Sequence, residues 1–170
     1  FRLDKLVSEN EYLKNYKIIF RPHPHRKDPR RFNLHGLKNV ILDPNVKKNY
    51  LKKIHDSKAL TNLDYYPSLI KNSSLIICGP TTMLIESAIF YKKTILLAMK
   101  GKEFFDHKNC YEKMLHLKEV HNFPFLRVNK SLDNLGFDIK SLFNLRIDKK
   151  LKLKNDKVLE YFLTSNTSNY

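Results

Sequence analysis

The sequence predicts an α/β fold in which helices cover both faces of a parallel sheet, of the Rossmann-like doubly wound kind. Short continuous apolar runs, typical of strands buried on both faces, alternate along the chain with segments of helical periodicity. Several of these runs stop at proline, at Gly-Pro or at Asp-Pro, as strands do where the chain turns away. The alternation predicts one domain over 1–163 and a polar tail at 164–170.

The first elements are expected to be a helix, two strands and a second helix. Apolar residues recur near helical spacing over 3–16. "KIIF" at 17–20 and "NVILDP" at 39–44 are short β-rich runs that end at prolines. "LDYYPSLIKNS" at 63–73 has helical character with an early proline, so we expect a helix there.

The middle of the chain predicts a strand, a helix and a strand in direct succession. "SLIICGP" at 74–80 is a buried strand that Gly-Pro stops, and "KTILLAM" at 93–99 is a second one. Between them, "TTMLIESAIFYK" at 81–92 has the apolar spacing of a helix. Such alternation favours parallel strands.

The last elements follow the same alternation. We expect a helix at 109–120, a short strand at 125–128, and helices at 131–143 and 155–163.

The chain is strongly basic. Its 170 residues carry 32 Lys and Arg against 17 Asp and Glu, a formal net charge of +15. This charge favours anionic partners such as nucleic acid, an acidic membrane face or phosphorylated substrates, although dispersed lysines also fit a solvated surface. Cys78 and Cys110 form no C-x-x-C pair, which fits reduced thiols in the cytoplasm. No apolar run approaches the length of a transmembrane helix.

Two polar groups follow predicted strands. "RPHPH", from Arg21, comes after the first strand, and "GPTT", from Gly79 to Thr82, comes after "LIIC". Ligands of open α/β sheets bind beyond the carboxyl ends of the strands, so we expect both groups at one edge of the sheet.

These groups have the chemistry of a phosphate site. Gly79 allows close backbone approach, Thr81 and Thr82 add hydroxyl donors at a helix start, and Arg21 and His23 add donors opposite. The alternative is structural: Thr81 or Thr82 would cap the helix, and His23 would be a loop histidine.

Glu86 lies about one turn into the same predicted helix. Its apolar neighbours set it apart from an ordinary surface carboxylate, although a solvated position remains the alternative.

A metal site and a nucleic-acid interface are not expected. His23-x-His25 is typical of metal-dependent hydrolases, but the other potential ligands lack the tight spacing of a metal motif. These other candidates are His55, Asp56, Asp64, Asp106 and His107. No helix-turn-helix, zinc-finger or RNA-binding aromatic motif accompanies the positive charge.

Together, "YKIIFRPHP" and "SLIICGPTTMLIESAIFYKKTILL" resemble the C-terminal, donor-binding half of GT-B glycosyltransferases. The nearest groups are bacterial capsule and surface-polysaccharide enzymes: CMP-sugar sialyltransferases, Kdo transferases and CDP-glycerol glycerophosphotransferases. The resemblance implies one half of a GT-B fold and a cytidine-nucleotide sugar or polyol donor. It implies a saccharide or lipid-linked acceptor and no cofactor. The catalytic base is expected outside this chain, and localisation in the cytoplasm or on the anionic inner membrane face is expected.

The resemblance also implies roles for single residues. His23 would contact the donor phosphate; Arg21, which the family does not single out, would add a donor beside it. Thr81 and Thr82 would take the place of the family's Ser/Thr pair at the same phosphate, and Glu86 would hold the donor ribose.

Two other functions stay open. One is half of a UDP-GlcNAc 2-epimerase, which shares the architecture and a similar helix start. The other is a non-catalytic module that binds nucleotides or polyanions through its charge.

Overall fold

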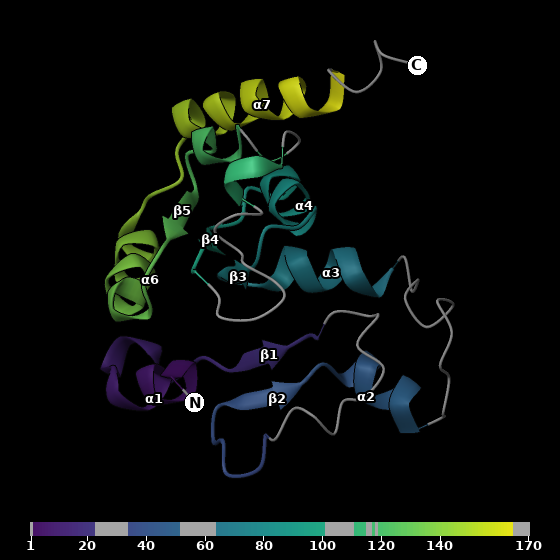
Figure 1. The fold of residues 1–170 in the computed structure, drawn as a ribbon, viewed down its shortest axis with the longest axis vertical. Helices are drawn as coiled ribbons and strands as arrows, with labels where there is room; N and C mark the ends of the chain where they lie inside the picture. Colours follow the sequence, from purple (N-terminus) through teal and green to yellow (C-terminus); the bar gives the residue numbers. More distant parts are fainter. Residues whose placement is uncertain are drawn as a thin grey trace. The chain divides into compact units, whose positions relative to one another are not determined.

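The structure is a computed structural model in which the chain divides into two compact units, Phe1–Tyr66 and Pro67–Tyr170 (Figure 1). Within the described residues, no helix has the length and apolarity to cross a bilayer. The described residues are 2–22, 34–51, 64–100, 111–114, 117 and 119–164.

The first unit contains a pair of parallel strands. β1 (Ile18–Phe20) pairs with β2 (Val40–Leu42) in register, with Ile18 opposite Val40. Both strands lie inside the ranges that their apolar runs predict. Because the pair is parallel, β1 and β2 end at the same edge.

The helix predicted over 3–16 is divided at Asn10. α1 (Arg2–Glu9) ends before it and the 3-10 turn η1 (Glu11–Leu13) follows it. Asn10 has an extended backbone, and its side-chain amide donates to the carbonyl of Leu6 at 2.7 Å. A short amide side chain competes with the backbone for hydrogen bonds, so asparagine favours such an interruption.

α2 (Pro44–Leu51) was not predicted. Asp43 precedes it, and the Asp43 Oδ1 accepts hydrogen bonds from the backbone amides of Asn45 at 2.8 Å and Val46 at 3.2 Å. These bonds satisfy amides that a helix start leaves free. The Asp-Pro pair that ends the strand is therefore also the start of a helix, with proline at its first position.

The second unit contains the three-stranded sheet. β3 (Ile76–Cys78), β4 (Thr94–Leu97) and β5 (Leu126–Asn129) are all parallel and follow the order β3-β4-β5. Each strand overlaps the position predicted for it. Because all three run in the same direction, their carboxyl ends lie at one edge of the sheet.

Helices α4 (Met83–Ile89) and α7 (Lys149–Thr164) pack on one face of this sheet. Their apolar side chains share a core with β4, β5 and the 3-10 turn η5 (Val120–Asn122). The buried members of this core are Leu84, Ala88, Leu96, Ala98, Leu117, Val120, Phe123, Leu126, Leu159 and Phe162.

Helix α6 (Leu135–Asn144) covers the opposite face (Figure 1). The buried side-chain amide of Asn129, at the end of β5, donates to Asp138 of α6 at 2.7 Å. Side chains alternate between faces along a strand, so Asn129 and the core residue Leu126 point to opposite sides. The three strands therefore form the middle of a three-layer α/β arrangement.

α4 ends earlier than the predicted limit of 92. Tyr91 has a positive φ of 52°, its amide donates to the carbonyl of Ala88, and the amide of Lys92 donates to Ser87 at 2.9 Å. This is the Schellman arrangement, which usually has glycine at the left-handed position. With tyrosine there, no residue type in the sequence indicates the end of the helix.

The remaining helices match their predictions in part. α3 (Tyr65–Asn72) lies within 63–73, whereas α7 begins before the predicted 155 because Asp148 Oδ1 accepts from the amide of Leu151 at 2.8 Å. The segment predicted as one helix over 131–143 begins with the 3-10 turn η6 (Leu132–Asn134) and continues as α6. Of the segment predicted as a helix over 109–120, residues 111–113 are helical and Val120 begins the 3-10 turn η5, whereas 109, 110, 115, 116 and 118 lie outside the described residues.

The parallel α/β class is confirmed, with one difference in the sheet. The described strands fall into two sheets, of two and three strands, where the sequence predicts one. The three-stranded unit is compatible with a Rossmann-like fold, and the assignment of 1–163 to one domain stays a prediction.

Candidate functional site

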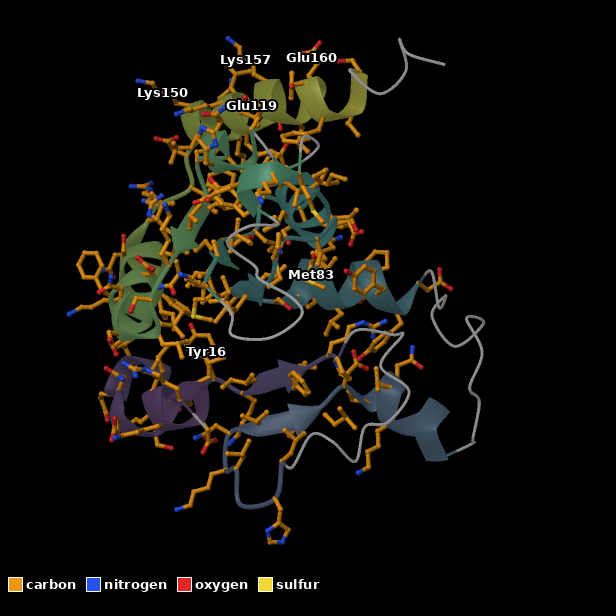
Figure 2. The ribbon with its side chains drawn as sticks, in the orientation of Figure 1. Tyr16, Met83, Glu119, Lys150, Lys157 and Glu160 are labelled. Carbon is orange, nitrogen blue, oxygen red and sulfur yellow. The ribbon has the colours of Figure 1, made fainter. Side chains whose placement is uncertain are left out.

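The loop from Gly79 to Thr82 follows β3 and leads into α4, whose first residue Met83 is labelled in Figure 2. Thr81 and Thr82 are exposed, and their carbonyls accept the amides of Leu84 and Ile85 at 3.1 and 2.9 Å. The loop therefore lies at the carboxyl edge of the three-stranded sheet, whereas the other predicted polar group follows β1, which belongs to the separate two-stranded sheet.

Thr82 does not cap the helix. Its backbone is already helical, with φ −58° and ψ −20°, and its side chain makes no capping hydrogen bond. A capping side chain needs an extended backbone to reach the amides of the first turn. Instead, the Thr82 hydroxyl and the Glu86 Oε1 form a hydrogen bond of 3.2 Å.

The second oxygen of Glu86 is left without a partner. Glu86 Oε2 is buried and accepts no hydrogen bond from any described residue. A buried carboxylate oxygen without a donor is unfavourable, because it has lost water and gained nothing in exchange. Glu86 is half-buried as a whole, with Oε1 in an exposed hydrogen bond and Oε2 buried.

Glu86 is close to the end of β3. Burial raises the pKa of the Cys78 thiol to about 12, and the negative charge of Glu86 adds to this shift. Cys78 is the last residue of β3, so the carboxylate influences the strand end where the Gly79–Thr82 loop begins. Among the residues of this unit, the structure thus brings together Thr82, Glu86 and the end of β3.

Thr81 contributes an available hydroxyl. Its side chain is exposed, and within the described residues it makes no side-chain hydrogen bond. With Thr82 engaged by Glu86, Thr81 is the hydroxyl of the pair that is free to donate to a ligand.

Arg21 belongs to the first unit, where it lies just after β1. Its guanidinium donates to the Asp43 carboxylate at 2.7 Å and lies 5.0 Å from the ring centroid of Tyr66. Asp43 is fully buried and also accepts from the Tyr65 hydroxyl at 3.0 Å. Burial, and then the hydrogen bond to Asp43, raise the pKa of Tyr65. The predicted phosphate contact of Arg21 stays a prediction.

The histidine predictions lie outside the described residues. His23, the predicted phosphate ligand, is among them. No group of three metal-binding side chains occurs in the part of the chain that the structure describes. The other metal candidates outside it are His25, His55, Asp56, Asp106 and His107.

Sequence reasoning missed two polar residues at strand ends. Asp43 directly follows β2 and accepts the hydrogen bond of Arg21. The Asp-Pro pair indicates a helix start, but it does not indicate that Arg21 is the partner of Asp43. Asn129 ends β5, is 1% exposed, and its side-chain oxygen has no partner among the described residues. Its position at a predicted strand end was the available signal.

Comparison with protein-family models, with curated proteins and with solved structures finds no match to this chain. The site therefore has to be interpreted from its own chemistry.

Proposed function

We propose that this chain is the donor-binding half of a GT-B glycosyltransferase or polyol-phosphate transferase of bacterial surface-polysaccharide synthesis. Its donor would be a cytidine nucleotide carrying a sugar or a polyol. The observation that carries the proposal is the buried, unpartnered Oε2 of Glu86 beside the Gly79–Thr82 loop.

The chemistry of Glu86 fits a ribose. One carboxylate oxygen is engaged by Thr82, which fixes the side chain, and the other needs a donor. A ribose hydroxyl supplies such a donor, and a hydrogen bond to an ionised group is stronger than one between neutral groups. Ligand binding would then satisfy an oxygen that the unliganded unit leaves unpaired.

The loop before α4 supports the phosphate side of the proposal. Transfer from a nucleotide donor builds negative charge on the departing phosphate, and fixed donors nearby stabilise it. The exposed hydroxyl of Thr81, five residues before Glu86 in the chain, offers one donor. The preference for cytidine rests on the resemblance of the two motifs, and His23 and Arg21 are not needed for this part of the proposal.

Titration of the 170-residue chain with CMP tests the proposal. We expect weak binding, because a donor-binding half would supply one wall of a GT-B cleft, and a loss of about tenfold in Glu86→Gln. Glu160→Gln, an exposed glutamate on α7, removes the same charge and should leave the affinity unchanged.

A comparison with 2′-deoxy-CMP sharpens the test. If Glu86 accepts from the ribose, loss of the 2′-hydroxyl weakens binding to the native chain more than to Glu86→Gln. An equal loss of affinity for 2′-deoxy-CMP in the native chain and in Glu86→Gln would contradict the ribose contact of Glu86. Unchanged CMP affinity in Glu86→Gln and in Thr81→Ala/Thr82→Ala would contradict the proposed position of the donor site. Tighter binding of UDP than CMP would favour the epimerase instead.

A further inference from the structure

α7 carries a continuous exposed stripe that the proposed donor site does not use. It consists of Lys150 and the residues three, four, seven and eleven positions after it, spacings that lie on one side of a helix: Leu153, Lys154, Lys157 and Tyr161. All five side chains are exposed. The exposed fraction is 59% for Leu153 and 51% for Tyr161. Lys150 and Lys157 extend outward from the same side of α7 in Figure 2. These five residues are the α7 stripe.

The opposite side of α7 fixes this orientation. Asn155, Leu159 and Phe162 are buried, and Phe162 stacks on Phe123 at a ring-centroid distance of 5.4 Å. The stripe therefore faces away from the core of its unit, and it does so on a helix that the core holds in place.

The positive charge of the α7 stripe is not neutralised. None of its three lysines makes an ion pair with a described residue, whereas the exposed Lys5 is paired with Glu9. One acid of α7, Asp156, is directed elsewhere: its hydrogen bond raises the pKa of Tyr91, beyond the end of α4. Glu160, also outward in Figure 2, is the acidic neighbour of the stripe on this helix.

The α7 stripe also has an apolar component. Leu153 and Tyr161 lie among the lysines, and a hollow of about 300 Å³ adjoins Tyr161. The hollow is lined by Glu119, Asn122, Lys154, Lys157, Val158 and Tyr161. Leucine and tyrosine exposed beside the three lysines give the α7 stripe both apolar and cationic character.

We propose that the α7 stripe docks the chain on the surface of an anionic lipid bilayer. Lysines near such a surface are attracted to the negative headgroups, while leucine and tyrosine favour the boundary with the acyl chains. Nucleic acid would use the same lysines, but it offers no comparable environment for the exposed leucine. The proposal is independent of the donor site and of the transferase activity.

Binding of the 170-residue chain to phosphatidylcholine vesicles with and without 30% phosphatidylglycerol, measured by co-sedimentation, tests the proposal. Lys150→Gln/Lys154→Gln/Lys157→Gln should weaken binding to the anionic vesicles on the order of a hundredfold, since each lysine contributes separately. The matched control, Lys71→Gln/Lys130→Gln/Lys140→Gln, removes the same charge from exposed sites of the same unit and should lose much less.

Two further variants test the geometry. Leu153→Ser/Tyr161→Ser keeps the charge but should also weaken binding, whereas Glu119→Gln, at the rim of the hollow, should strengthen it about fivefold. Circular dichroism establishes that each variant is folded.

Three results would overturn the proposal. They are equal binding to neutral and anionic vesicles, equal loss in the two triple variants, and unchanged binding in the serine variant. Tighter binding to single-stranded RNA than to vesicles, insensitive to Leu153, would assign the α7 stripe to nucleic acid instead.

Discussion

The side-chain amide of Asn155 in α7 donates a hydrogen bond of 3.0 Å to the backbone carbonyl of Ala88 in the last turn of α4. Asn155 is fully buried, and its own side-chain oxygen has no partner among the described residues. A cavity of about 10 Å³ adjoins it, lined in part by Lys92 and Thr94. This bond connects two helices that share one face of the sheet.

Asn155→Ala should lower the free energy of unfolding by about 1–2 kcal/mol. The substitution removes the bond and leaves a space in the core, but Ala88 keeps the amide of Tyr91 as a donor, so its carbonyl is not orphaned. Urea denaturation measures the change. Asn144→Ala, an exposed asparagine at the end of α6, should change stability by less than about 0.5 kcal/mol. Equal stability of the two variants would show that the interhelical bond contributes nothing.

Asp43→Ala should destabilise the first unit by about 3 kcal/mol, because it leaves the Arg21 guanidinium, whose side chain is 18% exposed, without its buried partner. It also removes the cap of α2, whereas Asp43→Asn keeps an oxygen for the cap and should cost less. Hydrogen exchange at the β1 and β2 amides reports on this unit directly. The exposed pair of Lys5 and Glu9 is the contrast: Lys5→Met should change stability by less than about 0.5 kcal/mol. If Lys5→Met and Asp43→Ala lower stability equally, the buried pair of Arg21 and Asp43 stabilises the first unit no more than an exposed pair does.

The strands were predictable and the helix ends were not. Strands β1 to β4 lie in short apolar runs, which residue type alone indicates, whereas β5 includes Arg127 and Asn129. The end of α4 at Tyr91 depends on a left-handed backbone that residue type does not favour. The division of the first helix at Asn10 depends on a hydrogen bond to Leu6 that competes with the helix.

The sequence predicts the loop of the candidate site, but not the hydrogen bonding of the polar atoms around it. The spacing of Thr82 and Glu86 by four residues on a helix indicates that the two can meet. Whether a carboxylate oxygen is buried without a donor depends on the packing around it, so Glu86 Oε2 and the amide oxygen of Asn129 could not be found in the sequence.

Lys93→Met should lower the free energy of unfolding by about 1–2 kcal/mol. The Lys93 ammonium donates to the carbonyl of Phe143 at 3.0 Å and lies 5.9 Å from the centroid of its ring. It thereby satisfies a carbonyl in the last turn of α6, where a positive charge is favourable. Methionine keeps much of the aliphatic stem, so the loss reports on the ammonium. Thermal unfolding at neutral pH measures it, with Lys140→Met, exposed on α6, as a variant that should behave like the native chain. If both melt alike, the ammonium does not stabilise the helix end.

Cys78 should behave as an inert thiol, and Glu86 should be part of the reason. Burial first, and then the Glu86 carboxylate, raise its pKa to about 12, so at pH 8 it should alkylate on the order of a thousandfold more slowly than an ordinary cysteine. The stability consequence follows from the sign of the shift. The folded thiol keeps its proton above pH 9, where the unfolded thiol loses it, so this stabilisation is complete below pH 9 and is lost as the pH rises toward 12. Glu86→Gln removes a negative charge that disfavours the Cys78 thiolate, and should therefore lower the pKa of Cys78 and speed its alkylation. Iodoacetamide labelling of a Cys110→Ala background isolates Cys78, and Glu160→Gln provides a charge-matched control that should not change the rate. Labelling as fast as that of a free thiol, or the same rate in Glu86→Gln and Glu160→Gln, would remove the electrostatic link between Cys78 and Glu86 at the end of β3.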